Sequence, residues 1–248
     1  MFEVGIKEIN LIGKKTLLTD VDFSLDENSI FTILGLNGSG KTTLIKSLTG
    51  ILNPRFYEIK GSVNLDGENI LNLNYEKLLQ LRREKIKYVF QDAVNSFDHL
   101  KTFEYYFEKL AKDKNEIDPL LEYFLLPKYS ELKRYYPYEV SGGMAQRINF
   151  VLVLLCRPQI IILDEPTSGI DLAISNLFLL KLKEFVKEKN NSALLVTHDL
   201  DFAKKISDKI AFLAEGKLSR FYLNDEFFSA HDSGSLEQFL NAHKQLSL

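Results

Sequence analysis

Residues 29–42 read SIFTILGLNGSGKT, and this stretch decides the fold. Its first part, Ser29–Leu34, is a short apolar run with β-branched and aromatic residues, which is typical of a strand buried on both faces. A glycine-rich loop follows, and the pattern then changes to an amphipathic helix over Thr42–Leu52. A loop of the form G-x-x-x-x-G-K-T between a buried strand and a helix predicts a phosphate-binding loop.

The residue types of this loop suit a nucleoside triphosphate. Its glycines let the backbone wrap closely around a phosphate with the amide groups pointing inward, and the positive end of the following helix attracts the same anion. We expect Lys41 to reach the β- and γ-phosphates of ATP and the Thr42 hydroxyl to ligate Mg²⁺. The predicted nucleotide-binding residues of the loop are Gly35, Leu36, Asn37, Gly38, Ser39, Gly40, Lys41, Thr42 and Thr43.

A second motif, IIILDE at residues 160–165, ends an apolar strand with two carboxylates. Ligands of open α/β sheets bind at the carboxyl edge of the strands, which is where Asp164 and Glu165 would emerge. We expect Asp164 to hold Mg²⁺, directly or through water, and Glu165 to polarise the attacking water as a general base. Taken alone, the motif fits an ordinary strand that ends in a solvated turn equally well, but the phosphate-binding loop favours the catalytic interpretation.

Two more predicted strands, Ile86–Phe90 and Ala193–Thr197, are each followed by a polar residue that would reach the same edge. Gln91 can offer its carbonyl oxygen to the metal or the water, and His198 can donate a hydrogen bond to the γ-phosphate. A lone histidine after a strand is usually structural, but four strands that each deliver a polar group to one edge favour a functional role. The predicted catalytic residues are Glu165, His198, Lys41 and Gln91, and the predicted metal ligands are Thr42, Gln91 and Asp164.

A third motif, VSGGMAQR at residues 140–147, predicts a second anion site. Ser141 can cap the helix that follows, and Gly142 and Gly143 leave the first amides of that helix uncovered. One chain then holds two phosphate-binding elements for a single nucleotide. A head-to-tail pair of chains resolves this, with the Ser141 element of one chain closing over the phosphate-binding loop of the other. The plain alternative is a capped helix with no ligand.

Strand-like and helical segments alternate along the chain, which indicates a parallel sheet with helices on both sides. The segments Met1–Ser24 and Ser62–Asp66 are expected to add antiparallel strands, and about Asp92–Val140 shows only helical patterns. The predicted fold class is α/β: a P-loop NTPase core with a parallel central sheet, an N-terminal antiparallel β-subdomain and an inserted helical subdomain. Further helices are expected at Phe103–Lys112, Gly143–Cys156 and Ser175–Lys189. We expect one domain over residues 1–222, with the helical subdomain at about 92–140, and a short helical extension over 223–248 that ends in a helix at Leu236–Leu246.

Composition excludes several classes of protein. The net charge of −3 and the pI near 5.9 argue against a nucleic-acid binder, and no nucleic-acid partner is expected. The single cysteine, Cys156, excludes an intramolecular disulfide and a multi-cysteine metal site. The most apolar region, Phe150–Leu163, is interrupted by Arg157-Pro158-Gln159 and falls short of the roughly 20 apolar residues that span a bilayer. The first ten residues do not resemble a signal peptide.

In this order and spacing, the motifs resemble those of the ATP-binding-cassette (ABC) ATPases, over about residues 1–222. The matching segments are Gly35–Thr42 (Walker A), Gln91 (Q-loop), Ser141–Gly143 (signature), Asp164-Glu165 (Walker B), Ser168–Asp171 (D-loop) and His198 (switch histidine). The resemblance implies an ATPase that uses ATP and Mg²⁺ and works as a pair of ATPase subunits.

A finer resemblance points to the ATPases of peptide and nickel importers. It rests on YPYEVSGGM at residues 136–144, CRP at 156–158, LDGE at 65–68 and VFQD at 89–92. It implies a peripheral subunit at the cytoplasmic face of the cell membrane, which drives import of peptides, nickel or a metal chelate through separate permease subunits. A solute-binding protein would act indirectly, and the second ATPase subunit would be an identical chain or a homologue. An exporter motor and a soluble, non-transport ABC ATPase stay open as alternatives.

The sequence departs from the family pattern at several positions. Ile12 stands where an aromatic residue usually stacks on adenine, so a nearby residue such as Phe2 is a candidate replacement. Met144 stands where glutamine is usual in the signature, and one cysteine excludes an iron–sulfur cluster. The candidates for permease contact in the helical subdomain are Phe97, Phe103, Tyr105 and Tyr106, although at least half of them are expected in its own core.

Overall fold

The computed structural model describes residues 1–188 and 190–229. Its strands are β1 (Phe2–Leu11), β2 (Lys15–Leu25), β3 (Ser29–Leu34), β4 (Tyr57–Leu65), β5 (Glu68–Asn69), β6 (Ile86–Val89), β7 (Ile160–Asp164), β8 (Ser192–Thr197), β9 (Lys209–Ala214), β10 (Lys217–Leu218) and β11 (Tyr222–Leu223). Its α-helices are α1 (Lys41–Leu48), α2 (Tyr75–Glu84), α3 (Phe103–Leu110), α4 (Ile117–Tyr123), α5 (Tyr129–Leu132), α6 (Gly142–Leu155), α7 (Leu172–Lys187), α8 (Leu200–Ile206) and α9 (Asn224–Ser229). The predicted helix Leu236–Leu246 lies outside the described residues.

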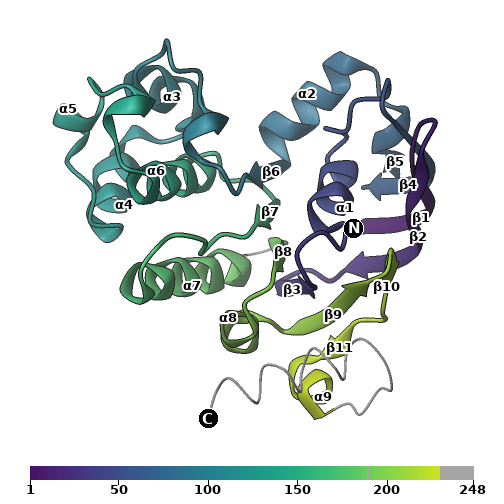
Figure 1. The fold of residues 1–248 in the computed structure, drawn as a ribbon. Coiled ribbons are helices and arrows are strands. Elements are labelled where there is room, and N and C mark those ends of the chain that lie inside the picture. Colours follow the sequence, from purple (N-terminus) through teal and green to yellow (C-terminus); the bar gives the residue numbers. More distant parts are fainter. Residues whose placement is uncertain (189, 230–248) are drawn as a thin grey trace.

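The strands of the described chain join into one 11-stranded sheet in the order β5-β4-β1-β2-β10-β9-β3-β8-β7-β6, with β11 paired to β9. Its centre, β9-β3-β8-β7-β6, is entirely parallel. Strands β3, β7 and β8 are buried along their whole length, because α1 packs on one face of the sheet and α6 and α7 pack on the other (Figure 1). The strands predicted at 29–34, 86–90, 160–163 and 193–197 are all present, and the predicted α/β fold class is confirmed.

The carboxyl ends of the central strands lie level with one another. Leu34 at the end of β3 pairs with Thr197 at the end of β8, and Val196 of β8 pairs with Asp164 at the end of β7. Whatever follows these three strands in the sequence therefore emerges at one edge of the sheet. The register alone places the glycine-rich loop, the acidic pair and His198 side by side.

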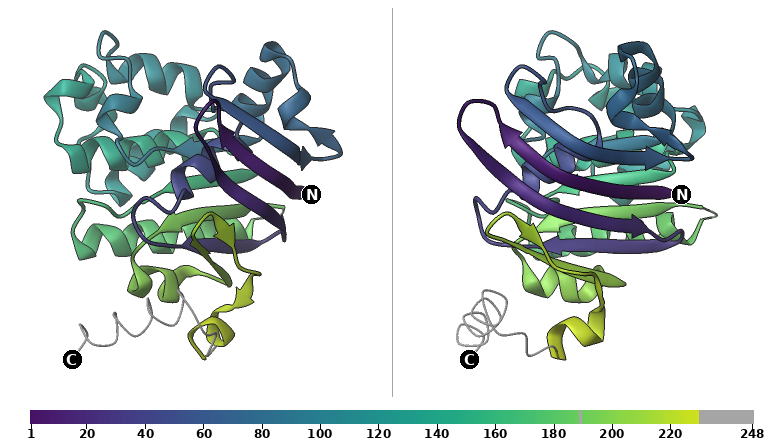
Figure 2. Two further views of the ribbon diagram at one scale, coloured as in Figure 1. Left: turned by 45° about the vertical axis from the view of Figure 1, so that its right-hand side comes forward. Right: turned by 90° about the vertical axis from the view of Figure 1, so that its right-hand side faces the viewer.

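The N-terminal strands form an antiparallel, strongly curved part of the sheet, which Figure 2 shows from the side. β1 pairs with β2 through a turn at Gly13 (φ 71°) and pairs along its other edge with β4. The sequence predicted only Ser62–Asp66 for this last strand. β4 begins earlier, at Tyr57, because β1 offers a partner for every residue down to the Leu11–Tyr57 pair.

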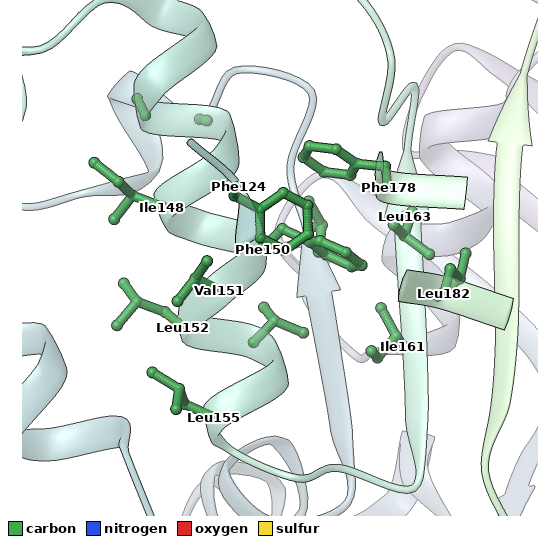
Figure 3. Close-up of a cluster of buried hydrophobic side chains, with 14 of the residues drawn as sticks. Phe124, Ile148, Phe150, Val151, Leu152, Leu155, Ile161, Leu163, Phe178 and Leu182 are labelled. Carbon is green, nitrogen blue, oxygen red and sulfur yellow. The ribbon is translucent and has the colours of Figure 1, made fainter. Parts of the chain in front are cut away.

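Helices α3, α4, α5 and α6 gather on one side of the sheet, between β6 and β7 in chain order (Figure 1). Three buried phenylalanines join this group to α7 (Figure 3). The rings of Phe150 and Phe178 stack with centroids 4.6 Å apart, and Phe124 meets them at 5.7 and 5.3 Å in edge-on geometry. The aromatic cluster anchors α6, and so fixes where the predicted second anion site begins.

Two of the residues predicted to face a permease do not lie on the surface. Phe97 and Phe103 are 7% and 0% exposed, and their rings meet at 5.3 Å inside the helical group, which agrees with the expectation that at least half of the four candidates lie in the core. Aromatic side chains on a short helix fill the nearest core when neighbouring helices cover them. Tyr105 is 42% exposed, and Tyr106 is half-buried. No helix within the described ranges is long and apolar enough to cross a membrane.

Candidate active site

The loop between β3 and α1 folds around the Lys41 side chain. Lys41 is only 6% exposed, and its Nζ donates hydrogen bonds to the carbonyl oxygens of Gly35 (2.7 Å) and Leu36 (3.1 Å). Burial lowers the pKa of Lys41, and the nearby Glu165 carboxylate opposes that shift. The ammonium group is thus held at the mouth of the loop, next to the backbone that would surround a phosphate.

At two positions in the loop, close contacts leave no room for a side chain. Gly40 caps α1 with φ 105°, and a Cβ there would lie 2.9 Å from Leu18 of β2. A Cβ on Gly35 would lie 2.5 Å from the backbone oxygen of Leu213, which cannot move aside. Beside them, the buried Ser39 hydroxyl has no hydrogen-bond partner among the described residues. A close-packed glycine backbone with an unsatisfied hydroxyl fits an anion such as phosphate, because buried polar groups normally have a partner.

Asp164 ends β7 as a buried carboxylate, 3% exposed. The Thr42 hydroxyl lies 3.3 Å from its Oδ1, and the Tyr88 hydroxyl donates to its Oδ2 at 2.8 Å. Burial raises the pKa of Asp164, while these two hydrogen bonds act to lower it. Burial likewise raises the pKa of Tyr88, so the phenol stays a proton donor. Hydroxyl and carboxylate oxygens that lie together are the ligands Mg²⁺ prefers, so Thr42 and Asp164 fit the predicted metal site.

Glu165 follows directly, with a backbone in the left-handed region (φ 48°), and is 7% exposed. Its Oε2 accepts a hydrogen bond from the Thr197 hydroxyl at 3.0 Å, and His198 Nδ1 lies 3.0 Å from the same oxygen. Its Oε1 lies 3.6 Å from Lys41 Nζ. The predicted base, the predicted histidine and the loop lysine therefore form one connected group.

A cleft of about 480 Å³ collects most of the predicted residues. It is lined by Asn37, Gly38, Gly40, Lys41, Thr42, Thr43, Gln91, Glu165, Ser168 and His198. Asp164 lines an adjoining hollow of about 420 Å³ together with Thr42 and Gln91, and the last two residues border both spaces. Gly35, Leu36 and Ser39 belong to the same loop without lining the cleft.

Two residues of this group, Tyr88 and Thr197, were not predicted from the sequence. Both lie inside strands, where the apolar pattern predicts burial and nothing more. Knowledge of which strands are neighbours could have identified Tyr88. Strand β6 pairs with β7 and places Tyr88 opposite Ile162, two residues before Asp164.

The Ser141 element does not reach the cleft of its own chain. Ser141 and Gly142 are exposed, and the Ser141 hydroxyl caps α6 by accepting from the Met144 amide at 3.2 Å. Farther along α6, the Gln146 side chain donates to the carbonyl oxygen of Pro166 at 2.6 Å. The helix is thus tied to the acidic loop, while its first amides face outward.

The structure shows that Phe2 cannot take the place of the aromatic residue that is missing at position 12. Phe2 is 2% exposed and lies at the far end of β1, where it pairs with Leu25 and Leu65. Ile12 lies at the opposite end, in the hairpin turn, and is 53% exposed. A hairpin strand of ten residues separates the two positions, so Phe2 cannot stack on a base near Ile12.

Comparisons with known proteins show the family of this chain. The model of the ABC transporter family matches residues 18–168. The oligopeptide transport ATP-binding protein OppD of Haemophilus influenzae is 31% identical over 225 residues, which cover 87% of this chain and 69% of the relative. OppD of Escherichia coli is 34% identical over 220 residues, with 84% and 64% covered. The glycine betaine transport ATP-binding protein OpuAA of Bacillus subtilis is 31% identical over 232 residues, with 92% and 54% covered. The chain thus spans about two thirds or less of each relative.

Solved structures share the fold. A dimeric, post-hydrolysis state of the ATP-binding cassette MJ0796 bound to ADP and Pi superposes with a TM-score of 0.76 at 24% identity, covering 90% of this chain and 99% of that one. A structure of the ATP-binding subunit of an ABC transporter gives 0.78 at 24% identity, covering 100% of each. Fold and site together define an ATP-binding, ATP-hydrolysing cassette. The chain belongs to the ABC transporter family, as the order of its motifs predicted.

Proposed function

We propose that this chain is the motor subunit of an importer, in which ATP binding and hydrolysis move oligopeptides through separate permease subunits. The observation that carries the proposal is the convergence of Lys41, Asp164, Glu165 and His198 at one edge of the sheet. The choice of oligopeptides is supported by the names of the OppD relatives. Nickel or a metal chelate is the other cargo that the sequence motifs suggest.

ATP binding follows from the loop geometry. The amides of the glycine loop and the positive end of α1 surround the phosphates, and Lys41 Nζ moves from the loop carbonyls to the β- and γ-phosphates. The buried Ser39 hydroxyl does not line the cleft, so it would have to turn toward the cleft to find in the phosphate the partner that it lacks. Thr42, Asp164 and Gln91 would hold Mg²⁺, which supplies charge neutralisation at the β- and γ-phosphate oxygens.

Hydrolysis needs a base and a group that senses the γ-phosphate. Glu165 borders the cleft with one oxygen toward Lys41 and the other toward His198, so it can accept a proton from a water placed between it and the γ-phosphate. His198 is half-exposed beside it and can donate to the γ-phosphate while it stays in contact with Glu165. Gln91 lines the same cleft and can orient the water through its amide oxygen.

The complete site requires a second ATPase subunit. Ser141, Gly142 and the free amides of α6 point away from the cleft of their own chain, and they form an anion site that suits the γ-phosphate bound to another chain. Two head-to-tail chains, identical or homologous, then close over two ATP molecules. Closing and reopening this pair would switch the permease between its two access states.

The permease partner is expected on the helical group. Tyr105 keeps 42% of its surface exposed at the outer side of α3, flanked by Lys101 and Lys109, whose ammonium groups each lie 5.4 Å from its ring. An amphipathic, partly exposed aromatic residue of this kind is typical of protein interfaces. The chain would work at the cytoplasmic face of the membrane as a peripheral subunit, with a solute-binding protein delivering cargo from the other side.

Transport in proteoliposomes tests the proposal. The complex is purified through a tag on this chain from detergent-solubilised membranes of its own organism and reconstituted with its solute-binding protein. We expect ATP-dependent uptake of oligopeptides, and no uptake from a matched complex that carries Glu165→Gln. Glycine betaine uptake with no peptide uptake would contradict the cargo and leave the motor role standing. Recovery of the chain with ribosomes and without permease subunits would contradict the motor role itself.

A further inference from the structure

The cleft lacks a surface for the nucleotide base. A purine ring binds most favourably against a flat aromatic or apolar group, yet apart from the His198 imidazole the residues that line the cleft are polar or glycine. His198 is engaged with Glu165 at the hydrolytic end. Phe90 borders the adjoining hollow, on the side of Asp164 where the metal ligands lie. The residues that line these two hollows therefore suit the phosphates and the metal, and none of them is placed to stack on the base.

A preformed aromatic surface exists elsewhere, directly before the Ser141 element. The rings of Tyr136 and Tyr138 stack in parallel, with centroids 5.4 Å apart and planes 9° from parallel. Tyr138 is 63% exposed, so its outer face is open to solvent. Phe150 and Phe178 form a comparable stack, but both rings are buried in the core. A parallel stack on the surface presents one flat face, which an edge-on pair does not.

Local hydrogen bonds hold the backbone that carries the tyrosine pair. The Glu139 carboxylate accepts from the Tyr136 amide at 2.8 Å, and the Glu139 amide donates to the Tyr136 carbonyl oxygen at 3.0 Å. Pro137, which is buried, fixes the backbone between the two rings. A group that is already ordered loses little freedom on binding, so the pair is suited to hold a ligand.

We propose that the Tyr136–Tyr138 pair of one subunit stacks on the adenine of the ATP whose phosphates are bound by the other subunit. The inference rests on the head-to-tail pairing proposed above. Tyr138 precedes Ser141 by three residues, and three residues of chain reach at most about 10 Å. That reach suits a segment that contacts the γ-phosphate through Ser141 and the base through Tyr138, at opposite ends of one nucleotide. The exposed Ile12 then needs no aromatic replacement within its own chain.

Dimerisation of the Glu165→Gln variant provides the assay, because slow hydrolysis lets the ATP-bound pair accumulate. In this background we expect Tyr138→Ala to raise the ATP concentration for half-maximal dimerisation by about 5- to 100-fold, the usual range for loss of one base–aromatic stack. Tyr138→Phe keeps the ring and should restore the parent value. Phe56→Ala is the matched control: this residue is 60% exposed, and its carbonyl oxygen accepts from the Ile12 amide, so it is the competing aromatic surface near the hairpin turn.

Base preference separates stacking from a merely structural role. The Glu165→Gln parent should dimerise at a lower concentration of ATP than of CTP, because the smaller pyrimidine stacks less. Tyr138→Ala should reduce the ratio of the two concentrations for half-maximal dimerisation. Photolabelling of the trapped dimer with 8-azido-ATP should mark residues 135–139. Labelling at residues 10–16 or 54–58, or an ATP dependence unchanged by Tyr138→Ala, would overturn the tyrosine assignment alone. If the Glu165→Gln chain forms no ATP-dependent dimer, the head-to-tail pairing fails, and the inference fails with it.

Discussion

Tyr88→Phe tests a contact that the motif pattern did not reveal. The change removes only the hydroxyl that donates to Asp164 Oδ2 at 2.8 Å, and it keeps the ring that packs 4.4 Å from Phe90. Asp164 is 3% exposed, so water cannot readily replace the lost donor. A hydrogen bond to a buried charged group contributes about 1.5–3 kcal/mol. We therefore expect the free energy of unfolding of the nucleotide-free chain to fall by about 1.5–3 kcal/mol.

Urea unfolding followed by circular dichroism measures this change, since the chain has no tryptophan for fluorescence. Tyr135→Phe is the matched control. Its hydroxyl also donates to a carboxylate, Glu131 Oε1 at 2.7 Å, but this contact is exposed, and even an exposed ion pair contributes only about 0–1 kcal/mol. Equal, small effects of the two substitutions would refute the argument that burial makes the Tyr88 contact strong.

Wild type and Tyr88→Phe should differ less in their free energy of unfolding at acidic pH. Burial raises the pKa of Asp164 and the Tyr88 hydrogen bond opposes this, so the pKa of Asp164 rises further in Tyr88→Phe. A carboxyl whose pKa is raised on folding binds its proton more tightly in the folded chain, which favours folding at low pH and disfavours it as the pH rises through that pKa. The stability gap between wild type and variant is thus largest at neutral pH and narrows as the pH falls through the raised pKa of Asp164. Unfolding measured with a chelator present, at neutral and mildly acidic pH, checks the sign.

Five further substitutions test the site and the core. Glu165→Gln should preserve ATP binding, lower turnover about 10²–10⁴-fold as expected for loss of a general base, and trap an ATP-bound dimer; a monomer under saturating ATP would count against the composite site. Lys41→Ala should abolish ATP binding in calorimetry, and an unchanged affinity would contradict its role. Gly35→Ala forces a Cβ to within 2.5 Å of a backbone oxygen and should destabilise the chain by about 1–3 kcal/mol, whereas Gly142→Ala, with no atom within 4 Å, should spare stability and still prevent dimerisation. Phe150→Ala should lower the free energy of unfolding, measured in urea, by about 3–5 kcal/mol. A loss below about 1 kcal/mol would mean that packing of the aromatic cluster contributes little to stability.

The parts of the site that could be read from sequence are those fixed by local chain geometry. Residues 29–42 hold a strand, a loop and a helix start in one continuous stretch, so the phosphate loop needs no distant partner to form. Asp164 and Glu165 follow a strand that is apolar throughout, and parallel strands buried on both faces are the easiest to recognise. Their convergence then follows from the rule that parallel strands end at a common edge.

The parts that escaped prediction depend on contacts between distant segments. Tyr88 becomes a donor to Asp164 only because β6 lies next to β7 in a register that no local pattern specifies. Phe2 is near Ile12 in sequence but a full strand length away in space, because β1 is extended. Phe97 is buried by helices that the pattern places nearby without saying which faces meet. Strand order, register and helix packing were missing in each case, and none of them is a local property.

The position of α6 joins the two halves of the proposed composite site. The start of α6 at Ser141 and Gly142 is exposed, while Gln146 about one turn later donates to Pro166, the residue after Glu165. Gln146 is 3% exposed, and leaving such a buried amide without a partner costs about 1–3 kcal/mol. Separating the start of α6 from the acidic loop would therefore cost about this much free energy. In the proposed head-to-tail pair, a shift of Glu165 in one site would then tend to displace the Ser141 element that closes the other site.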